Sequence, residues 1–147
     1  MTSHSVKHST FTLERTYAPA PAAVFAAWSD RDTKARWFAA LDGRYSLDFR
    51  VGGTETVHGD KGTGLVARST YHDIVLDERI VYTTALSTDE ALSTVSLTTV
   101  QFVPDGNGTR LVLVEQGTFL DNQEQPDWRE QGTADWLDAL GREVDER

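Results

Sequence analysis

The sequence predicts an α+β domain in which a curved antiparallel sheet packs against one long C-terminal helix. Its segments follow a characteristic order: a strand, two short helices, an uninterrupted series of strands, and one amphipathic helix. The 147 residues match the size of one domain, and the chain contains no internal repeat or linker. We therefore expect a disordered tail over residues 1–9 and one domain over residues 10–147.

The composition excludes several classes of partner and chemistry. Lys and Arg number 14 and Asp and Glu 23, which leaves a formal net charge of −9. Because nucleic acids and anionic membranes attract cationic surfaces, we expect neither as a partner. The absence of cysteine excludes disulfides and thiolate catalysis. The chain starts without the apolar stretch of a signal peptide and has no long apolar run, which favours a soluble cytoplasmic protein.

Strand and helix signals alternate at the start of the domain. Residues 11–17 (FTLERTY) alternate apolar and polar side chains, as a half-buried strand does. Pro21 suits the first turn of a helix, expected over residues 22–29, because its missing N–H leaves no hydrogen bond unmade there. Asp30 is expected to cap a second short helix over residues 32–37.

The middle of the chain predicts strands joined by tight turns. A strict period of two places four apolar side chains on one face: Tyr45, Leu47, Phe49 and Val51. The glycine pair at residues 52–53 favours a hairpin, with the return strand over residues 54–58. Further strands are expected over residues 65–75, 80–86, 93–103 and 109–119.

The last two strands carry apolar side chains on both faces. Leu111 and Leu113 share one face, and Val112 and Val114 share the other. One face is expected to line the interior, and the other is either packed, mixed or the contact surface of a homodimer.

The final helix combines a start signal with an apolar stripe. Asp127 followed by Glu130 has the spacing of a capping box. The apolar residues that recur at helical spacing are Trp136, Leu137, Leu140 and Val144. Gly132 costs about 1 kcal/mol inside a helix, so we expect a strand, the helical corner or a ligand to approach it closely.

Motifs for common chemistries are missing. Neither the G-x-S-x-G nucleophile motif nor a Gly-rich phosphate loop occurs. The group His58, Asp60, His72 and Asp73 lacks the helical spacing of a metal site, and we expect no metal and no cofactor.

Glu115 is the main candidate for chemistry. It shares strand parity with Leu111 and Leu113, so an inward face would place its carboxylate among apolar side chains and raise its pKa. A general acid or base, assisted by His58 or Tyr71, is one interpretation. The alternative is a residue near the strand end that forms a structural ion pair with an arginine, for instance Arg68 or Arg50.

Aromatic residues are numerous, and a sheet folded around one helix leaves space that side chains do not always fill. The expected ligand-lining residues are Trp37, Phe38, Phe49, Tyr71, Tyr82, Glu115, Phe119, Trp136 and Leu140.

Five segments together resemble the homologues of the activator of the heat-shock protein ninety ATPase, within the START-like, or SRPBCC, superfamily. They are VFAAWSDRDTKARWF, LDFRVGGTE, LDERIVYT, FVPDGNGTRLVLVEQ and QGTADWLDAL. The resemblance implies a helix-grip fold of about six or seven strands around the terminal helix. The chain departs from the family pattern at Thr54 and Thr133, where aromatic residues are usual, which suggests an altered pocket.

Three functions follow as expectations. The first is binding of a small hydrophobic or amphipathic molecule between sheet and helix. The second is a cyclase, dehydratase or hydrolase-like enzyme that uses Glu115. The third is a co-chaperone-like interaction module, which the resemblance suggests although the chain has no room for the further domain of the eukaryotic activators.

Overall fold

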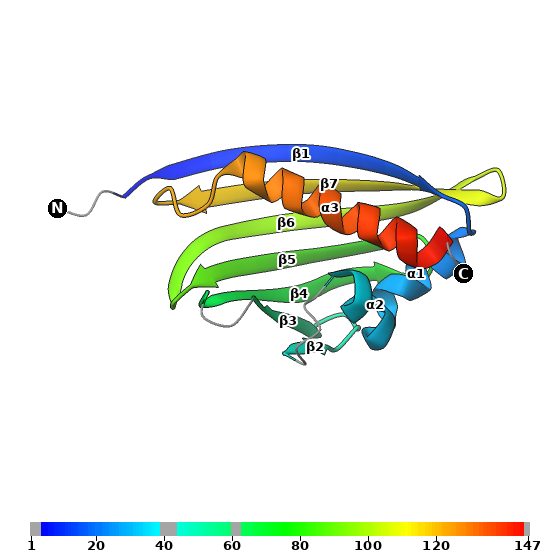
Figure 1. Cartoon of the computed structure of the whole chain (residues 1–147), viewed down its shortest axis with the longest axis horizontal. Coiled ribbons are helices and arrows are strands. Elements are labelled where there is room, and N and C mark those ends of the chain that lie inside the picture. Colours follow the sequence, from blue (N-terminus) through cyan, green and yellow to red (C-terminus); the bar gives the residue numbers. More distant parts are fainter. Residues whose placement is uncertain (1–3, 39–43, 60–62, 146–147) are drawn as a thin grey trace.

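The chain folds into one sheet with a long helix across its curved face (Figure 1). The computed structural model describes residues 4–38, 44–59 and 63–145. In these residues the elements are β1 (Val6–Tyr17), α1 (Pro21–Ser29), α2 (Arg31–Phe38), β2 (Tyr45–Leu47), β3 (Thr54–His58), β4 (Leu65–Val75), β5 (Arg79–Thr88), β6 (Ala91–Asp105), β7 (Gly108–Leu120) and α3 (Pro126–Asp145). The predicted α+β helix-grip architecture is confirmed.

The sheet has the strand order β1-β7-β6-β5-β4-β3-β2, and every neighbouring pair is antiparallel. In Figure 1, α3 runs along the sheet beside β1, β7 and β6, and α1 and α2 lie near the C-terminal end of α3, where α1 contacts β6 and β7 and α2 contacts β2. Strands β2 to β7 are neighbours in the same order as in the sequence, and only β1 pairs with a strand distant in sequence, β7. The region under α3 is therefore bounded by strands on one side and by helices at one end.

β1 begins earlier than expected. Its first residue, Val6, pairs with Leu120 of β7, and the pairing continues without a break to Tyr17. Residues 6–9, which were expected in the disordered tail, therefore belong to a strand. The apolar–polar alternation starts only at Phe11, but backbone hydrogen bonds to β7 need no alternation, so the pattern underestimated the strand.

The helices start close to the predicted positions. α1 begins at Pro21, and the Oδ2 atom of Asp30 accepts a hydrogen bond from the backbone N–H of Thr33 (3.0 Å), as predicted for the cap of α2. The predicted cap of α3 is wrong. α3 begins at Pro126, so Asp127 lies in its first turn, and the backbone carbonyl of Gln125 accepts the first hydrogen bonds.

The expected strand over residues 45–51 ends early. β2 stops at Leu47, and Val51 is 58% exposed in a turn instead of sharing the buried face. Gly52 adopts a φ of +84°, and a Cβ on Gly53 would clash with the carbonyl oxygen of Asp48. The two glycines thus allow a tight turn that begins before them, which pulls the chain out of the sheet.

The core lies between the sheet and all three helices. Its largest buried side chain, Trp28, packs against Trp37 with 4.9 Å between ring centroids and against Phe102 at 6.1 Å. On β7 the face of Leu111 and Leu113 is the buried one. Its interior face therefore includes Glu115, two residues farther along.

Candidate functional site

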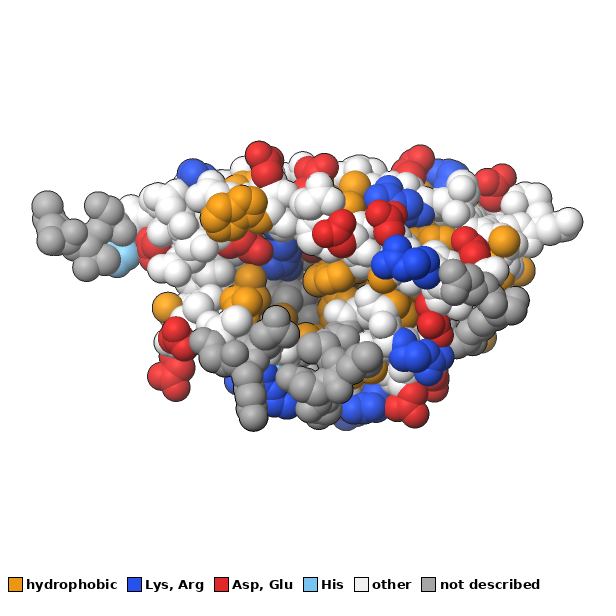
Figure 2. Space-filling view, viewed as in Figure 1, with side chains coloured by type: hydrophobic (Ala, Val, Ile, Leu, Met, Phe, Trp, Pro, Cys, Tyr) orange, Lys and Arg blue, Asp and Glu red, His pale blue; other side chains and the backbone are white. Residues whose placement is uncertain are grey.

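A cavity of about 170 Å³ lies between the sheet and the N-terminal half of α3. Figure 2 shows the molecule hollowed on this side, with charged and hydrophobic side chains around the hollow. The described residues that line it are Phe38, Val57, Ala67, Ser69, Tyr82, Thr84, Leu86, Glu115, Glu124, Trp128, Arg129, Gly132, Thr133 and Trp136. The expected space between sheet and helix is therefore present.

The strand register explains the chemistry of the cavity floor. Residues that pair across neighbouring strands form rows, and alternate rows face inward. One row is apolar and contains Val57, Ala67 and Leu86. The next inward row carries hydroxyls: Ser69 pairs with Thr84, whose partner on β6 is Ser96. The floor of the cavity thus changes from apolar side chains to hydroxyl groups between one inward row and the next.

The third inward row brings Glu115 to the cavity. It runs from Tyr82 on β5 through Thr98 on β6 to Glu115 on β7. The Thr98 hydroxyl donates to Glu115 Oε1 at 3.0 Å. The pKa of the Tyr82 phenol is raised mainly by burial and, next, by the negative charge of the nearby Glu115 carboxylate.

Arg129 of α3 completes the charged end of the cavity. Its Nε donates to Glu115 Oε2 at 2.8 Å, and its Nη2 donates to the Ser96 hydroxyl at 2.9 Å. The side chains of Arg129 and Glu115 are only 10% and 4% exposed. Burial disfavours the guanidinium charge, but Glu115 and Glu124 outweigh it and raise the pKa of Arg129. The pair is thus a buried ion pair with its hydrogen bonds satisfied, the condition under which such a pair is tolerated.

A second carboxylate, Glu124, stands at the same end. Its Oε1 accepts a hydrogen bond from the Thr94 hydroxyl at 2.7 Å, whereas the Arg129 Nη1 is 3.5 Å away. Arg129 therefore binds Glu115 closely and Glu124 loosely.

The opposite end of the cavity is aromatic. The rings of Phe38 and Trp136 pack edge to face with 4.5 Å between centroids.

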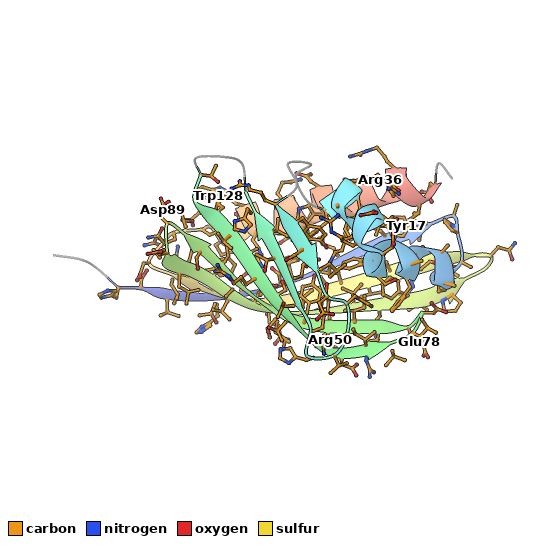
Figure 3. All side chains as sticks on the ribbon, turned by 90° about the horizontal axis from the view of Figure 1, so that it is seen from below. Tyr17, Arg36, Arg50, Glu78, Asp89 and Trp128 are labelled. Carbon is orange, nitrogen blue, oxygen red and sulfur yellow. The ribbon has the colours of Figure 1, made fainter. Side chains whose placement is uncertain are left out.

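Trp128 lines the cavity from the first turn of α3 and is 65% exposed, so it stands at the mouth of the cavity. Figure 3 shows Trp128 at the end of the molecule away from Tyr17 and Arg36, which places the mouth far from α1 and the C-terminal half of α3.

A second buried ion pair lies behind the aromatic wall. The Lys34 Nζ is 2.6 Å from Glu55 Oε2, and it stands 4.4 Å from the centroid of the Phe38 ring. Burial lowers the pKa of Lys34, although Glu55 acts in the opposite direction. Glu55 also accepts a hydrogen bond from the Tyr45 hydroxyl. Neither charged group lines the cavity. The pair links α2 to β3 and holds the Lys34 ammonium against the Phe38 ring, which does line the cavity.

Gly132 faces open space. A Cβ atom built there would have no neighbour within 4 Å, whereas a Cβ at Gly141 of the same helix would lie 3.3 Å from the Tyr17 ring. The expectation that another part of the protein packs closely against Gly132 is therefore wrong. The missing side chain enlarges the cavity.

The structure brings together four of the nine expected ligand-lining residues: Phe38, Tyr82, Glu115 and Trp136. The other five lie in the interior away from the cavity: Trp37, Phe49, Tyr71, Phe119 and Leu140. Inward parity and an aromatic side chain thus identify interior residues, but do not distinguish those that face empty space from those that pack against each other.

The three candidate catalytic residues are not assembled. Glu115 lines the cavity, while Tyr71 is buried near Tyr82 (5.8 Å between ring centroids). His58 follows Val57 by one residue and so points to the opposite face of β3. The expected alternative, an ion pair between Glu115 and an arginine, is confirmed, but the partner is Arg129 and not Arg68 or Arg50.

The sequence analysis considered His58, Asp60, His72 and Asp73 as metal ligands and expected no site there. Within the described residues no three His, Asp or Glu side chains cluster as metal ligands. The Nε2 atom of His72 lies 2.8 Å from the Thr83 hydroxyl, and Asp73 accepts from Arg79. Asp60 lies outside the described residues.

Four charged residues of the interior were missed from the sequence: Lys34, Glu55, Glu124 and Arg129. Arg129 lies four residues before Thr133 and eight before Leu137, on the buried stripe of α3, and this spacing was a usable signal. No pattern of comparable strength marked Glu124, which lies in the connection before α3.

Comparison with known proteins places these features in a family. A family model described as Activator of Hsp90 ATPase homolog 1-like protein matches residues 18–145. The solved structure of an uncharacterized protein from Rhizobium leguminosarum is 37% identical, with 99% of this chain and 100% of that chain covered and a TM-score of 0.92. No curated protein matches the sequence.

Two further solved structures agree. A protein from Rhizobium loti is 44% identical, with 95% of this chain and 99% of that chain covered and a TM-score of 0.88. A protein from Chromobacterium violaceum is 25% identical, with 92% and 96% covered and a TM-score of 0.74. None of the helices in the described residues combines the length and the apolar character that a membrane span requires.

Proposed function

The chain belongs to the family of Activator of Hsp90 ATPase homolog 1-like proteins, and from this premise we propose that it binds a small hydrophobic or amphipathic molecule in the cavity between α3 and the sheet. The observation that carries the proposal is the cavity itself, at which Gly132 leaves open space in the middle of a helix. A helix that had only to pack on the sheet would gain stability from almost any other residue there.

The size of the cavity limits the ligand. A dry protein cavity of about 150 Å³ holds one benzene molecule, and this cavity measures about 170 Å³. The part of the ligand that lies inside is therefore no larger than one ring with a short arm. Because the cavity has a mouth beside Trp128, a longer ligand could extend outward from it.

The lining favours an amphipathic ligand. The rings of Phe38 and Trp136 and the side chains of Val57 and Leu86 offer apolar contact, while hydroxyls and charged groups stand at the other end. Pockets that bind small molecules are mostly apolar with a few placed polar groups.

Binding is a better account of this geometry than turnover. Glu115 is held by Arg129 and Thr98, and the partners predicted for acid–base chemistry, His58 and Tyr71, do not line the cavity with it. These contacts support a role for the carboxylate as a fixed polar group of a binding site, and not as an acid or base.

The test is a binding screen with two variants at one position. Native mass spectrometry and ligand-observed NMR would be applied to single-ring aromatics and short amphiphiles with wild type, Gly132→Ala and Gly132→Leu. We expect Gly132→Ala to bind ligand and Gly132→Leu to lose binding, because only the larger side chain occupies the cavity. If wild type binds none of the panel, or if Gly132→Leu binds as well as wild type, the proposal is wrong.

A further inference from the structure

The charged end of the cavity carries more negative than positive groups. Among the described lining residues, two carboxylates, Glu115 and Glu124, face one guanidinium, that of Arg129. Lys34 and Glu55 behind the wall neutralise each other at 2.6 Å. The start of α3 adds roughly half a positive charge, and the local sum stays negative.

The surplus charge belongs to Glu124. Both of its described hydrogen bonds, from Thr94 and from Arg129, go to Oε1. No donor from the described residues reaches Oε2. Since a carboxylate can accept about four hydrogen bonds, Glu124 retains accepting capacity at the cavity. Its side chain is only 17% exposed, so water screens this charge less than it would at the surface.

Aromatic rings surround the same space. Phe38, Tyr82, Trp128 and Trp136 line the cavity. The faces of such rings attract cations by about 0.5–2 kcal/mol, and most strongly where water is excluded. The protein already uses this interaction nearby, because the Lys34 ammonium stands within 5.0 Å of the ring centroids of Trp28 and Phe38.

On these observations, and resting on the proposed function, we propose that the ligand of this cavity is a small organic amine in its ammonium form, with one ring and a short arm. The ring packs against the Phe38 and Trp136 rings on the side that faces the cavity. The ammonium group donates hydrogen bonds to Glu124 Oε2 and faces the aromatic rings. A carboxylate-bearing ligand of the same shape would be repelled by Glu124 and would have to compete with Glu115 for Arg129.

The opposite reading, that Arg129 recognises an anion, is weaker. Three of its five N–H groups already point to partners: Nε to Glu115, Nη2 to Ser96 and Nη1 to Glu124. An anion would bring a third negative charge to one buried cation. The loose contact with Glu124 is the part of the network that a ligand can most easily replace.

The experiment compares probes of one shape and different charge. Benzylamine, benzyl alcohol, toluene and benzoate would be titrated into the wild-type protein at neutral pH, with dissociation constants from calorimetry and competition NMR. We expect benzylamine to bind about tenfold more tightly than benzyl alcohol, and benzoate to bind most weakly. Benzoate binding as tightly as benzylamine would overturn the inference.

A pair of charge-matched variants locates the effect. Glu124→Gln removes the surplus charge and should abolish the preference for benzylamine over benzyl alcohol without weakening toluene binding. Glu130→Gln removes the same charge from an exposed position of α3 outside the cavity and should leave the preference unchanged. A preference that survives in Glu124→Gln contradicts the inference. Should that variant not fold, the wild-type series alone decides.

The outcomes separate the two proposals. If toluene and benzyl alcohol bind and benzylamine binds no better, the cavity is a ligand site and the amine inference is wrong. If none of the four probes binds, both the amine inference and the proposed function fail for single-ring ligands.

Discussion

Replacing Gly132 by Ala tests directly whether the space under α3 is empty. Gly132 lies in the interior of a 20-residue helix, and a Cβ there meets no atom within 4 Å. The matched control is Gly141→Ala in the same helix, where the new Cβ would stand 3.3 Å from Cε1 of Tyr17. The Tyr17 hydroxyl donates to the carbonyl of Leu137, so its ring has little freedom to move aside.

The expected magnitude follows from helix propensity. Ala is favoured over Gly inside a helix by about 1 kcal/mol, and nothing in the structure opposes this gain at Gly132. The variant should therefore unfold about 2–4 °C above wild type. At Gly141 the close contact with Tyr17 offsets the same gain, so we expect less than half of it.

The assay is urea and thermal denaturation followed by circular dichroism and tryptophan fluorescence, with wild type and both variants under the same conditions. The midpoint in urea should rise by roughly 0.5 M for Gly132→Ala. A loss of stability in Gly132→Ala, or an equal gain in the two variants, would show that the surroundings of the two glycines do not differ and would refute the reasoning.

Three further predictions concern the interior. Lys34→Met leaves Glu55 buried without its cation and should lower the free energy of unfolding by about 3–5 kcal/mol, and the double variant Lys34→Met with Glu55→Gln should recover most of this loss. Arg110→Met, which breaks an exposed pair, should cost about 1 kcal/mol or less in the same denaturation assay. Equal losses in Lys34→Met and Arg110→Met would contradict the assignment of a buried pair. Gly53→Ala should cost about 2 kcal/mol or more, since its Cβ would meet the Asp48 carbonyl, and wild-type stability would contradict this. Burial raises the pKa of all four tyrosines above their ordinary value of 10.0, so the unfolded chain loses its phenol protons at a lower pH than the folded protein does. This contribution to stability is complete below pH 10, and above pH 10 the free energy of unfolding should fall by up to about 5 kcal/mol per pH unit. The lowered pKa of Lys34 has the opposite effect on stability, but only below the ordinary lysine value of 10.5. Phenolate absorbance that appears well before unfolding would contradict the last prediction.

Much of the fold could be predicted because local signals and tertiary structure agree. Pro21 at the start of α1, the Asp30 cap of α2 and the strand over residues 65–75 were all predicted and observed. The errors occur where backbone pairing or a turn decides. Residues 6–9 join a strand through hydrogen bonds to β7, and the chain turns before Gly52 although the apolar alternation continues to Val51.

The charged interior could be predicted only in part. Parity correctly places Glu115 on the inward face, and helical spacing places Arg129 on the buried stripe of α3. Neither pattern predicts which of the inward side chains contact each other, because the contact between Arg129 and Glu115 depends on how the chain after β7 places α3 on the sheet. The ion pair between Lys34 and Glu55 could not be predicted for the same reason, since the two residues belong to elements that are separate in the sequence.

The central claim is that α3 lies across the sheet without filling the space beneath its first turns. The most direct measurement is a crystal structure of the protein grown with benzylamine. The account predicts ordered ligand density beside Gly132, with a ring packed against Phe38 and Trp136 and the amine nitrogen within hydrogen-bond distance of Glu124. Protein side chains that occupy this space and leave no room for a ring would contradict it.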